Sequence, residues 1–209
     1  MIAVALAGGG ERVVAWEAGV LSGLRVRPDV VLGTSAGALV AARFAAGWAA
    51  QDEVAPGPHP AEAFARLAAV WESAGKTLQA RRRTLGRCAV AASPGGEEAF
   101  VARVAARVPP LWPAGLQVAA IDADSGERVI FSGGDVARAV AASRAVPGLL
   151  PPVTIDGRRY VDGALGSATN ADVLHGEVII IAPFGDGPVD RLWREALTSE
   201  VSALERDEA

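Results

Sequence analysis

The stretch DVVLGTSAGALVAARFAAG, residues 29–47, decides the fold of this chain. Its apolar beginning at 30–32 predicts a strand, and the part after Gly37, rich in Ala, Leu and Val, predicts a helix. Between them stands G-x-S-x-G, residues 33–37, in the strand–turn–helix setting that gives this pattern its meaning as a nucleophile elbow. The turn is so tight that we expect a strained backbone at Ser35 and an exposed hydroxyl. An ordinary glycine-rich turn is the alternative interpretation.

Glycines on both sides of this serine make the turn feasible. Gly33 and Gly37 have no Cβ, so the strand and the helix can pass close to one another. The helix that begins at Ala36 also directs free N–H groups and the positive end of its dipole toward Ser35. Negative charge that forms beside this hydroxyl would be stabilised there.

A second glycine-rich turn follows the first predicted strand. Residues 2–7 form a short apolar run, which is typical of a central strand covered on both faces. Gly8, Gly9 and Gly10 come directly after it. Three consecutive glycines can turn their N–H groups into one concavity that binds an anion or an oxyanion. No P-loop is present because Gly-Lys-Ser/Thr does not follow, and a dinucleotide-binding fingerprint fails at Val13.

Composition sets the broad class. With 209 residues the chain fits a single domain over 1–209, in which we expect 48–115 to form a cap insertion. Although 51% of the residues are hydrophobic, no run reaches the ~18 apolar residues of a membrane span. The apolar beginning lacks the basic residues of a signal peptide. One cysteine and a net charge of −4 argue against a disulfide framework and a nucleic-acid binder, so we expect a cytoplasmic protein.

The remaining elements follow from hydrophobic spacing and turn residues. Amphipathic helices are predicted at 61–74, 100–108, 135–144 and 189–206. Hairpins are predicted at 117–132, around the turn 124–126, and at 153–161, around the turn 156–157. Residues 178–181 are expected to be a buried strand. Strands and helices together indicate the α/β class.

Five basic residues gather in one stretch without any acidic residue, although the whole chain is acidic: Lys76, Arg81, Arg82, Arg83 and Arg87. A solvated basic face is one interpretation. The other is a peripheral contact with anionic membranes through the three consecutive arginines, with Leu78 and Leu85 dipping into the interface beside them.

Three motifs, in this order, resemble the patatin-like phospholipase family. Residues 8–12, GGGER, are similar to its G-G-G-x-R/K oxyanion loop. Residues 33–37 match its G-T-S-A-G nucleophile motif, and residues 162–164 match its D-G-G/A motif. The segment SRAVPGLLPPVTIDGRRYVDGA that ends in this last motif is also similar to the family's approach to its aspartate. The resemblance covers about 1–47 and 117–172.

The resemblance implies a three-layer α/β/α fold with a mostly parallel central sheet and a small helical cap. It also implies a lipid acyl hydrolase that takes a lipid or another acyl ester as substrate. Ser35 would attack the carboxylic ester and Asp162 would act directly as its base, without a histidine, a metal or a cofactor. The oxyanion would be held by N–H groups of Gly8, Gly9 and Gly10. The residues that support the motifs are Arg12, Gly33, Gly37 and Gly163.

The aspartate is the demanding part of this chemistry. An ordinary carboxyl group, with a pKa of ~3.9, is a poor proton acceptor at neutral pH. Partial burial of Asp162 would raise its pKa and make it a better base.

The chain departs from the family's pattern at two positions. Val13 stands where the family has glycine, and we expect a negative φ there, so that the glycine concavity still forms. Residues 170–172, Asn-Ala-Asp, stand where the family has N-x-P, so the chain should leave this loop less rigidly.

Three other interpretations stay open. His175 follows Asp162 and could complete a Ser–Asp–His triad, and His59, between two prolines, has less claim. The chain could instead be a non-catalytic α/β module that binds an anion or a nucleotide with the Gly8–Gly10 loop alone. Arg12 could contact a substrate anion or form a structural ion pair, of which the structural role is favoured.

Overall fold

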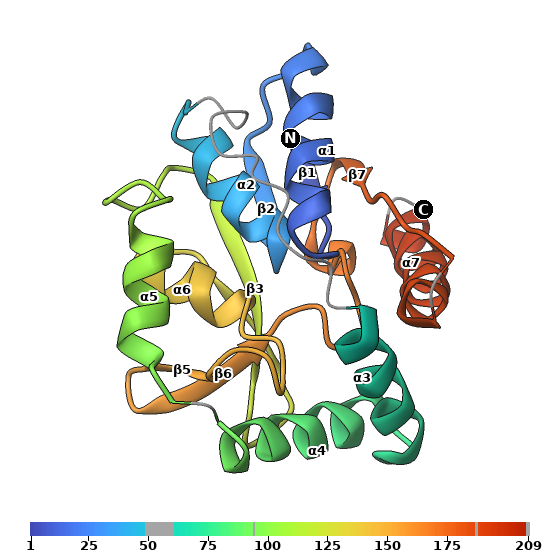
Figure 1. The fold of residues 1–209 in the computed structure, drawn as a ribbon. Helices are drawn as coiled ribbons and strands as arrows, with labels where there is room; N and C mark the ends of the chain where they lie inside the picture. The colour runs from blue at the N-terminus through green and yellow to red at the C-terminus, as the bar shows by residue number, and fades with distance from the viewer. Residues whose placement is uncertain (49–60, 94, 187, 208–209) are drawn as a thin grey trace.

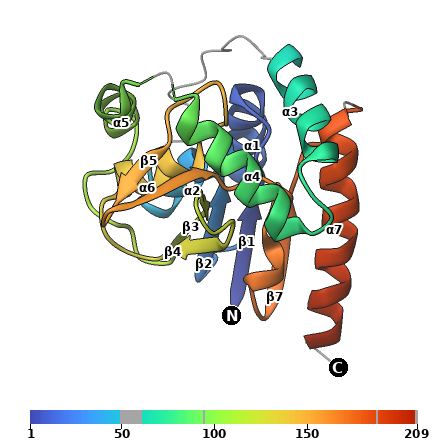
Figure 2. The ribbon, with the colours of Figure 1, turned by 90° about the horizontal axis from the view of Figure 1, so that it is seen from below.

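The computed structural model describes residues 1–48, 61–93, 95–186 and 188–207. They form one mixed sheet with helices on both faces (Figures 1 and 2). The order of the strands is β5-β6-β3-β2-β1-β7, and β4 pairs with β3. The strands are β1 Ile2–Leu6, β2 Val30–Thr34, β3 Leu116–Asp122, β4 Arg128–Phe131, β5 Val153–Ile155, β6 Arg158–Asp162 and β7 Glu177–Ile181.

The four strands β7, β1, β2 and β3 are parallel, and they form the centre of the sheet. Strands β4, β5 and β6 are joined by antiparallel pairs. Both predicted hairpins are present, as β3–β4 and β5–β6. At the tip of the second, Asp156 and Gly157 have φ values of 50° and 76°, as a type I′ turn requires. The mixed, mostly parallel sheet that the resemblance implied is confirmed.

The helices cover both faces of this sheet. Their bounds are α1 Glu11–Gly23, α2 Ala36–Ala45, α3 Ala61–Ser73, α4 Leu78–Ala91, α5 Glu97–Ala105, α6 Val136–Ser143 and α7 Pro188–Asp207, with a 3-10 turn, η2, at Ala171–Val173. Among the helices that the structure describes, none is long and apolar enough to cross a membrane.

Alternation along β1 explains the layers. Val4 and Leu6 face a core cluster built with α1, α2, α5 and α6. Ala3 and Ala5 face the other side, where Ala171 of η2 and Leu204 of α7 are among their neighbours. The result is the three-layer α/β/α arrangement expected from the resemblance (Figure 2).

The segment expected to be a cap divides into two parts. Helix α3 packs beside α7, and α4 packs on β3 and β6. A cluster around Trp71 and Leu85 joins these two helices to β3, β6 and Leu165 (Figure 1). Helix α5 instead packs on α6 and places Phe100 and Val104 in the main core. The predicted loop at 51–60, with His59, lies outside the described residues.

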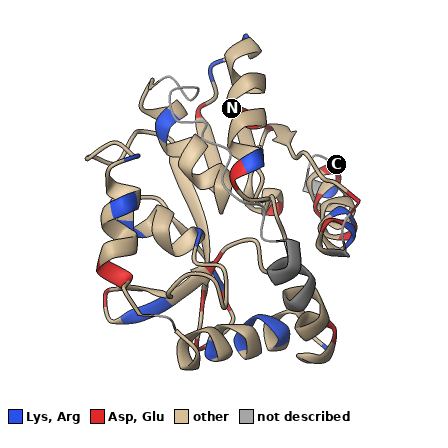
Figure 3. Cartoon of the chain, viewed as in Figure 1, with Lys and Arg blue, Asp and Glu red and all other residues tan. Residues whose placement is uncertain are grey.

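Three consecutive arginines of α4 point in three directions, because neighbouring residues on a helix are about 100° apart. Arg81 is half-buried with its guanidinium over the Trp71 ring, 5.7 Å from the centroid. Arg82 is only 7% exposed, whereas Arg83 is exposed (Figure 3 shows the basic residues along α4). Leu85 is 2% exposed. The predicted membrane contact included all three arginines and Leu85. It is wrong for Arg82 and Leu85, because both are buried.

Candidate active site

Strand register brings the two candidate catalytic residues together. Thr34, the last residue of β2, pairs with Ala119 of β3, and Asp162, the last residue of β6, pairs with Ala120. The chain therefore leaves both strands beside consecutive residues of β3. Ser35 Oγ donates a hydrogen bond of 2.7 Å to Asp162 Oδ2.

The elbow has the strained backbone that the motif predicts. Ser35 has φ 53° and ψ −115°, a conformation that costs a non-glycine residue about 1–3 kcal/mol. A Cβ on Gly33 would lie 2.4 Å from the Cα of Ala38, and one on Gly37 would lie 2.4 Å from the carbonyl oxygen of Leu6. Both glycines are thus needed for close approach. The serine is only 7% exposed, so the expected exposed hydroxyl is wrong for bulk solvent: Ser35 lines a cavity instead.

Ser143, at the end of α6, ties the two residues to each other. Its Oγ accepts a hydrogen bond of 2.8 Å from the Ser35 N–H, and its carbonyl oxygen accepts one of 3.2 Å from the Gly163 N–H. The carbonyl of Ala145 accepts from the Asp162 N–H at 3.0 Å. Sequence reasoning did not single out Ser143, although it begins the segment SRAVPG that resembles the family.

Burial tunes the aspartate. Asp162 is 3% exposed, and this burial raises the pKa of its carboxyl group to about 7, although hydrogen bonds from Ala164 and Ser35 and the charge of Arg144 oppose the shift. Its Oδ1 accepts from the Ala164 N–H at 2.8 Å. The group is therefore balanced between its neutral and charged forms at neutral pH, as a general base should be.

The glycine loop offers two donors rather than three. The Gly8 N–H donates to the carbonyl of Ala168 at 2.9 Å. The prediction that Gly8 is an oxyanion donor is therefore wrong. Its role is steric, because a Cβ there would lie 3.1 Å from the Cβ of Ser35. Gly9 and Gly10 have φ values of 156° and 80°, and neither N–H has an acceptor among the described residues. Gly9 lines the same cavity as Ser35.

The first turn of α2 has fewer free N–H groups than expected. The Gly37 N–H donates to the carbonyl of Ala7, and the Ala38 N–H donates to that of Ser35, both at 3.1 Å. The Ala36 N–H donates to no other residue in the described part of the chain. Ala36 thus adds a third candidate donor next to the nucleophile.

Val13 fits its position in the first turn of α1. It is absent from the residues with positive φ, so the expected negative φ is confirmed. Its N–H donates to the Gly10 carbonyl at 3.0 Å. The neighbouring Arg12 is exposed and makes no ion pair with another described residue. The ion pairs at this end of α1 belong to Glu11, which contacts Arg107 and Arg144.

The loop after the aspartate motif is held more firmly than its sequence suggested. Asn170, at φ 50°, is fully buried and donates from Nδ2 to Thr34 Oγ1 at 3.1 Å. Glu200 of α7 accepts hydrogen bonds from the hydroxyls of Ser167 and Thr169. These side-chain bonds hold the loop where the family has a proline, and the lower rigidity expected from its absence stays a prediction.

A mostly apolar cavity of about 220 Å³, here called the Ser35 cavity, opens from the serine and the aspartate. Helix α3 contributes Trp71 to its wall, and α7 contributes Trp193. Its other apolar lining residues are Leu67, Ala68, Val146, Pro147, Ala164, Leu165, Val189, Leu192 and Ala196. Two charged residues, Arg81 and Glu195, lie at its edge. No group of three or more metal-ligating side chains occurs in the described ranges.

Topology separates His175 from this site. It is exposed and lies just before β7, whose first residue pairs with Ile2 of β1. Ser35 lies after the opposite end of the parallel strands, roughly 16 Å away for five residues at ~3.3 Å each. Sequence order allows a Ser–Asp–His triad, but this arrangement excludes it.

We therefore expect His175→Ala to retain ester hydrolysis within about tenfold, since no proton transfer depends on this side chain. Initial rates on one soluble ester, with wild type measured in parallel, provide the comparison. A loss of about 10³-fold would instead establish a triad.

A family model described as patatin-like phospholipase matches residues 4–56 and 122–175. Together the two segments make up just over half of the chain. They contain the glycine loop, the serine elbow and the aspartate motif. Helices α3, α4, α5 and α7 lie outside the matched residues.

Proposed function

The chain belongs to the patatin-like phospholipase family, and on this premise we propose that it is a lipid acyl hydrolase that cleaves carboxylic esters with a Ser35–Asp162 dyad. The observation that carries the proposal is the 2.7 Å hydrogen bond between the two side chains, made at the wall of an apolar cavity. An acyl chain is the substrate part that this lining would accept, and the reacting ester would lie beside Ser35.

In the proposed reaction Ser35 Oγ attacks the ester carbonyl while its proton passes to Asp162 Oδ2. The N–H groups of Gly9 and Gly10 stabilise the oxyanion of the tetrahedral intermediate, together with the N–H of Ala36. Asp162 then gives the proton to the departing alcohol, which leaves an acyl group on the serine. Water attacks this acyl group, Asp162 takes its proton, and the free acid departs as the serine regains its hydrogen.

The proposal is tested by hydrolysis of a panel of esters that differ in head group and chain length, with Ser35→Ala as the blank. Turnover of any member by the wild type alone supports an acyl hydrolase. A non-catalytic module that binds anions through the glycine loop would give no turnover. Such a module would have only the N–H groups of Gly9 and Gly10 to bind the anion, because the Gly8 N–H is engaged. The same panel identifies the preferred head group.

We further propose one domain over 1–209 in which α3 and α4 act as the cap. Leu67 and Trp71 of α3 and Arg81 of α4 line the Ser35 cavity, so these two helices cover the space beside the nucleophile. Helix α5 is not part of this proposal, since its side chains pack in the main core.

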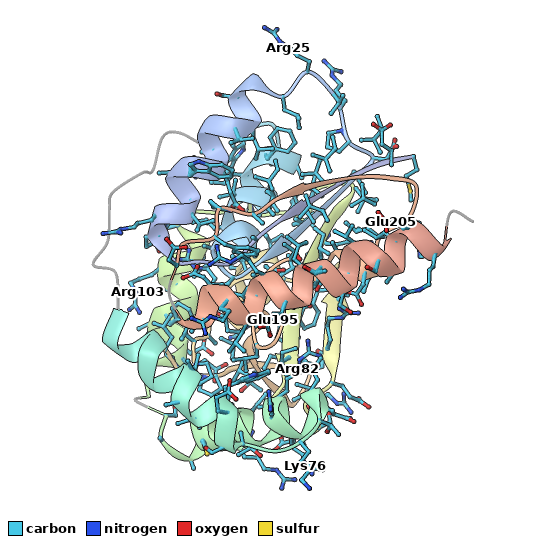
Figure 4. All side chains as sticks on the ribbon, turned by 90° about the vertical axis from the view of Figure 1, so that its right-hand side faces the viewer. Arg25, Lys76, Arg82, Arg103, Glu195 and Glu205 are labelled. Carbon is cyan, nitrogen blue, oxygen red and sulfur yellow. The ribbon has the colours of Figure 1, made fainter. Side chains whose placement is uncertain are left out.

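A peripheral membrane contact is proposed for the exposed residues of the basic stretch. Lys76, Arg83 and Arg87 are exposed, and Leu78, in the first turn of α4, is 46% exposed. Figure 3 shows basic residues along α4, and Figure 4 shows Lys76 at this end of the molecule. Basic side chains near an anionic leaflet attract it, and an exposed apolar residue can enter the interface. Such a contact would bring the cap to lipid substrates.

We expect Arg83→Gln with Arg87→Gln to weaken binding to phosphatidylglycerol vesicles by at least about fivefold at low salt, with a soluble ester still hydrolysed at the wild-type rate. Vesicle co-sedimentation measures the binding. The matched control is Arg25→Gln with Arg27→Gln, which removes the same charge at the far end of the molecule, where Figure 4 shows Arg25. If both double variants weakened vesicle binding equally, the effect would come from net charge alone, and the proposed contact through α4 would be refuted.

A further inference from the structure

A second cavity, here called the Arg82 cavity, lies beside the Ser35 cavity and shares Gly166 and Ala196 with it. Its volume is about 650 Å³, and it is an open cavity bordered by α4, the β3–β4 turn, the loop after the aspartate motif and α7. No step of the proposed reaction uses it. Figure 4 shows Arg82 in the region between α7 and α4.

Arg82 is a buried cation that makes no direct ion pair with another described residue. It is 7% exposed, and its Nε donates to the carbonyl of Leu165 at 2.7 Å. Neither Nη group donates to another residue in the described ranges, and no carboxylate there lies within ion-pair distance. Burial, together with the charge of Arg128, lowers the pKa of its guanidinium to about 10, although the charges of Asp172 and Glu200 oppose this shift. The Nη groups are not among the buried atoms without a partner, so they are open to the cavity, where an anion could bind against them.

The carboxylates around the cavity are engaged elsewhere. Both oxygens of Asp172 accept from Arg128, at 2.6 and 2.8 Å. Glu200 accepts from the hydroxyls of Ser167 and Thr169, and from a backbone N–H at 2.9 Å. Glu127, the remaining acidic residue of the lining, is exposed. Asp172 is therefore paired with Arg128 and Glu127 is solvated, whereas Glu200 has only neutral donors and attracts Arg82 from beyond ion-pair distance.

Other donors in the lining are free. Gln79 of α4 and Ser199 and Arg206 of α7 line the cavity, and their side chains make no hydrogen bond to another described residue. An amide, a hydroxyl and a guanidinium thus join Arg82 around one space, from two different helices. A carboxylate has two oxygens in one plane to offer such a set. A free phosphate or a phosphate monoester has four or three, and a phosphodiester has two that are unesterified.

We propose that the Arg82 cavity binds a phosphate group, with Arg82 as its main ligand and Gln79, Ser199 and Arg206 as further donors. The group is a free phosphate compound or the phosphodiester of a lipid head group. Both present unesterified phosphate oxygens to the guanidinium, three or four in the first case and two in the second. This site is separate from the Ser35–Asp162 dyad, so it can be tested whether or not the chain hydrolyses esters.

Isothermal titration calorimetry of the whole protein tests the site with inorganic phosphate, glycerol 3-phosphate and glycerophosphocholine, at constant ionic strength. We expect at least one of them to bind with a Kd of about 1 mM or tighter. Arg82→Gln should weaken binding by at least about tenfold, because the charge-assisted bonds are lost. Arg83→Gln, which removes the neighbouring exposed charge, is the matched control and should change binding less than about twofold.

A second pair of variants tests the site independently, in case Arg82→Gln does not fold. Ser199→Asp places a negative charge on the cavity wall without touching a buried contact, and it should weaken binding by at least about fivefold. Thr198→Asp, the adjacent exposed position outside the lining, should bind as wild type does. Preference for glycerophosphocholine points to a lipid head group, and preference for the two other compounds points to a free phosphate. Absence of binding by wild type at about 10 mM, or equal binding by wild type and Ser199→Asp, overturns the proposal.

Discussion

Ser35→Ala and Asp162→Asn are each expected to lower ester hydrolysis by at least about 10³-fold, and the double variant to lose little more than either one. The two side chains share one proton, as their 2.7 Å hydrogen bond indicates, so removing either partner disables the same step. Initial rates on the best ester of the panel give the three values. The fold should survive, because an asparagine can keep the bonds at both positions of the carboxylate.

Asp122→Asn is the matched control for the aspartate. Asp122 is another buried carboxylate of the same sheet, 4% exposed, and its Oδ1 holds the N–H groups of the β3–β4 turn. An asparagine keeps that oxygen, so activity should stay within about threefold of wild type. Near-normal turnover by Asp162→Asn would show that the dyad is wrongly assigned, and losses that multiply in the double variant would mean that the two residues act independently.

The second prediction concerns pH. As the pH rises from the ordinary pKa of an aspartate to the folded-state pKa of Asp162, the stability of the wild type should fall while its activity rises. Asp162 has a folded-state pKa of about 7 against an ordinary value of 3.8, so the folded state keeps a proton that the unfolded state has lost. The stability of the wild type therefore falls as the pH rises from 3.8 to about 7. Over the same range kcat/KM should rise about tenfold per pH unit and then level off, since the base must be charged.

Asp162→Asn removes this stability cost. Its free energy of unfolding should exceed that of the wild type by about 1 kcal/mol at pH 4.5 and by about 4 kcal/mol at pH 8, from 1.36 kcal/mol per pKa unit. Urea unfolding at the two pH values measures the difference. The buried Glu17, whose pKa is also raised by burial, is present in both proteins and cancels in the comparison. A difference independent of pH would contradict the assigned pKa.

The sequence predicts those parts of the structure in which a motif requires one particular backbone geometry. Gly33 and Gly37 predicted an elbow because only glycine permits the close approach, and Asp156-Gly157 predicted a hairpin for a similar reason. Gly8 shows where this reasoning ends. Its motif indicated an oxyanion donor, but its N–H is engaged by Ala168, a partner 160 residues away in the chain.

Side-chain partners from distant elements could not be predicted from the sequence. Ser143 holds the Ser35 N–H, and Glu200 fastens the loop after the aspartate, yet neither belongs to a local pattern. The sequence analysis does not predict helix α4, because its apolar residues are few. The helix has an N-cap all the same: Thr77 Oγ1 accepts a hydrogen bond of 3.2 Å from the Ala80 N–H. The inward position of Arg82 depends on how that helix packs, which a run of arginines does not reveal.

Labelling with a fluorophosphonate, followed by peptide mass spectrometry, tests most directly whether Ser35 is an activated nucleophile. The reagent forms a covalent bond only with a serine whose proton is taken by a nearby base. The account predicts one adduct, on the peptide that carries Ser35, with labelling much slower in Asp162→Asn. No adduct on the folded wild-type protein, or an adduct on another serine, would contradict it.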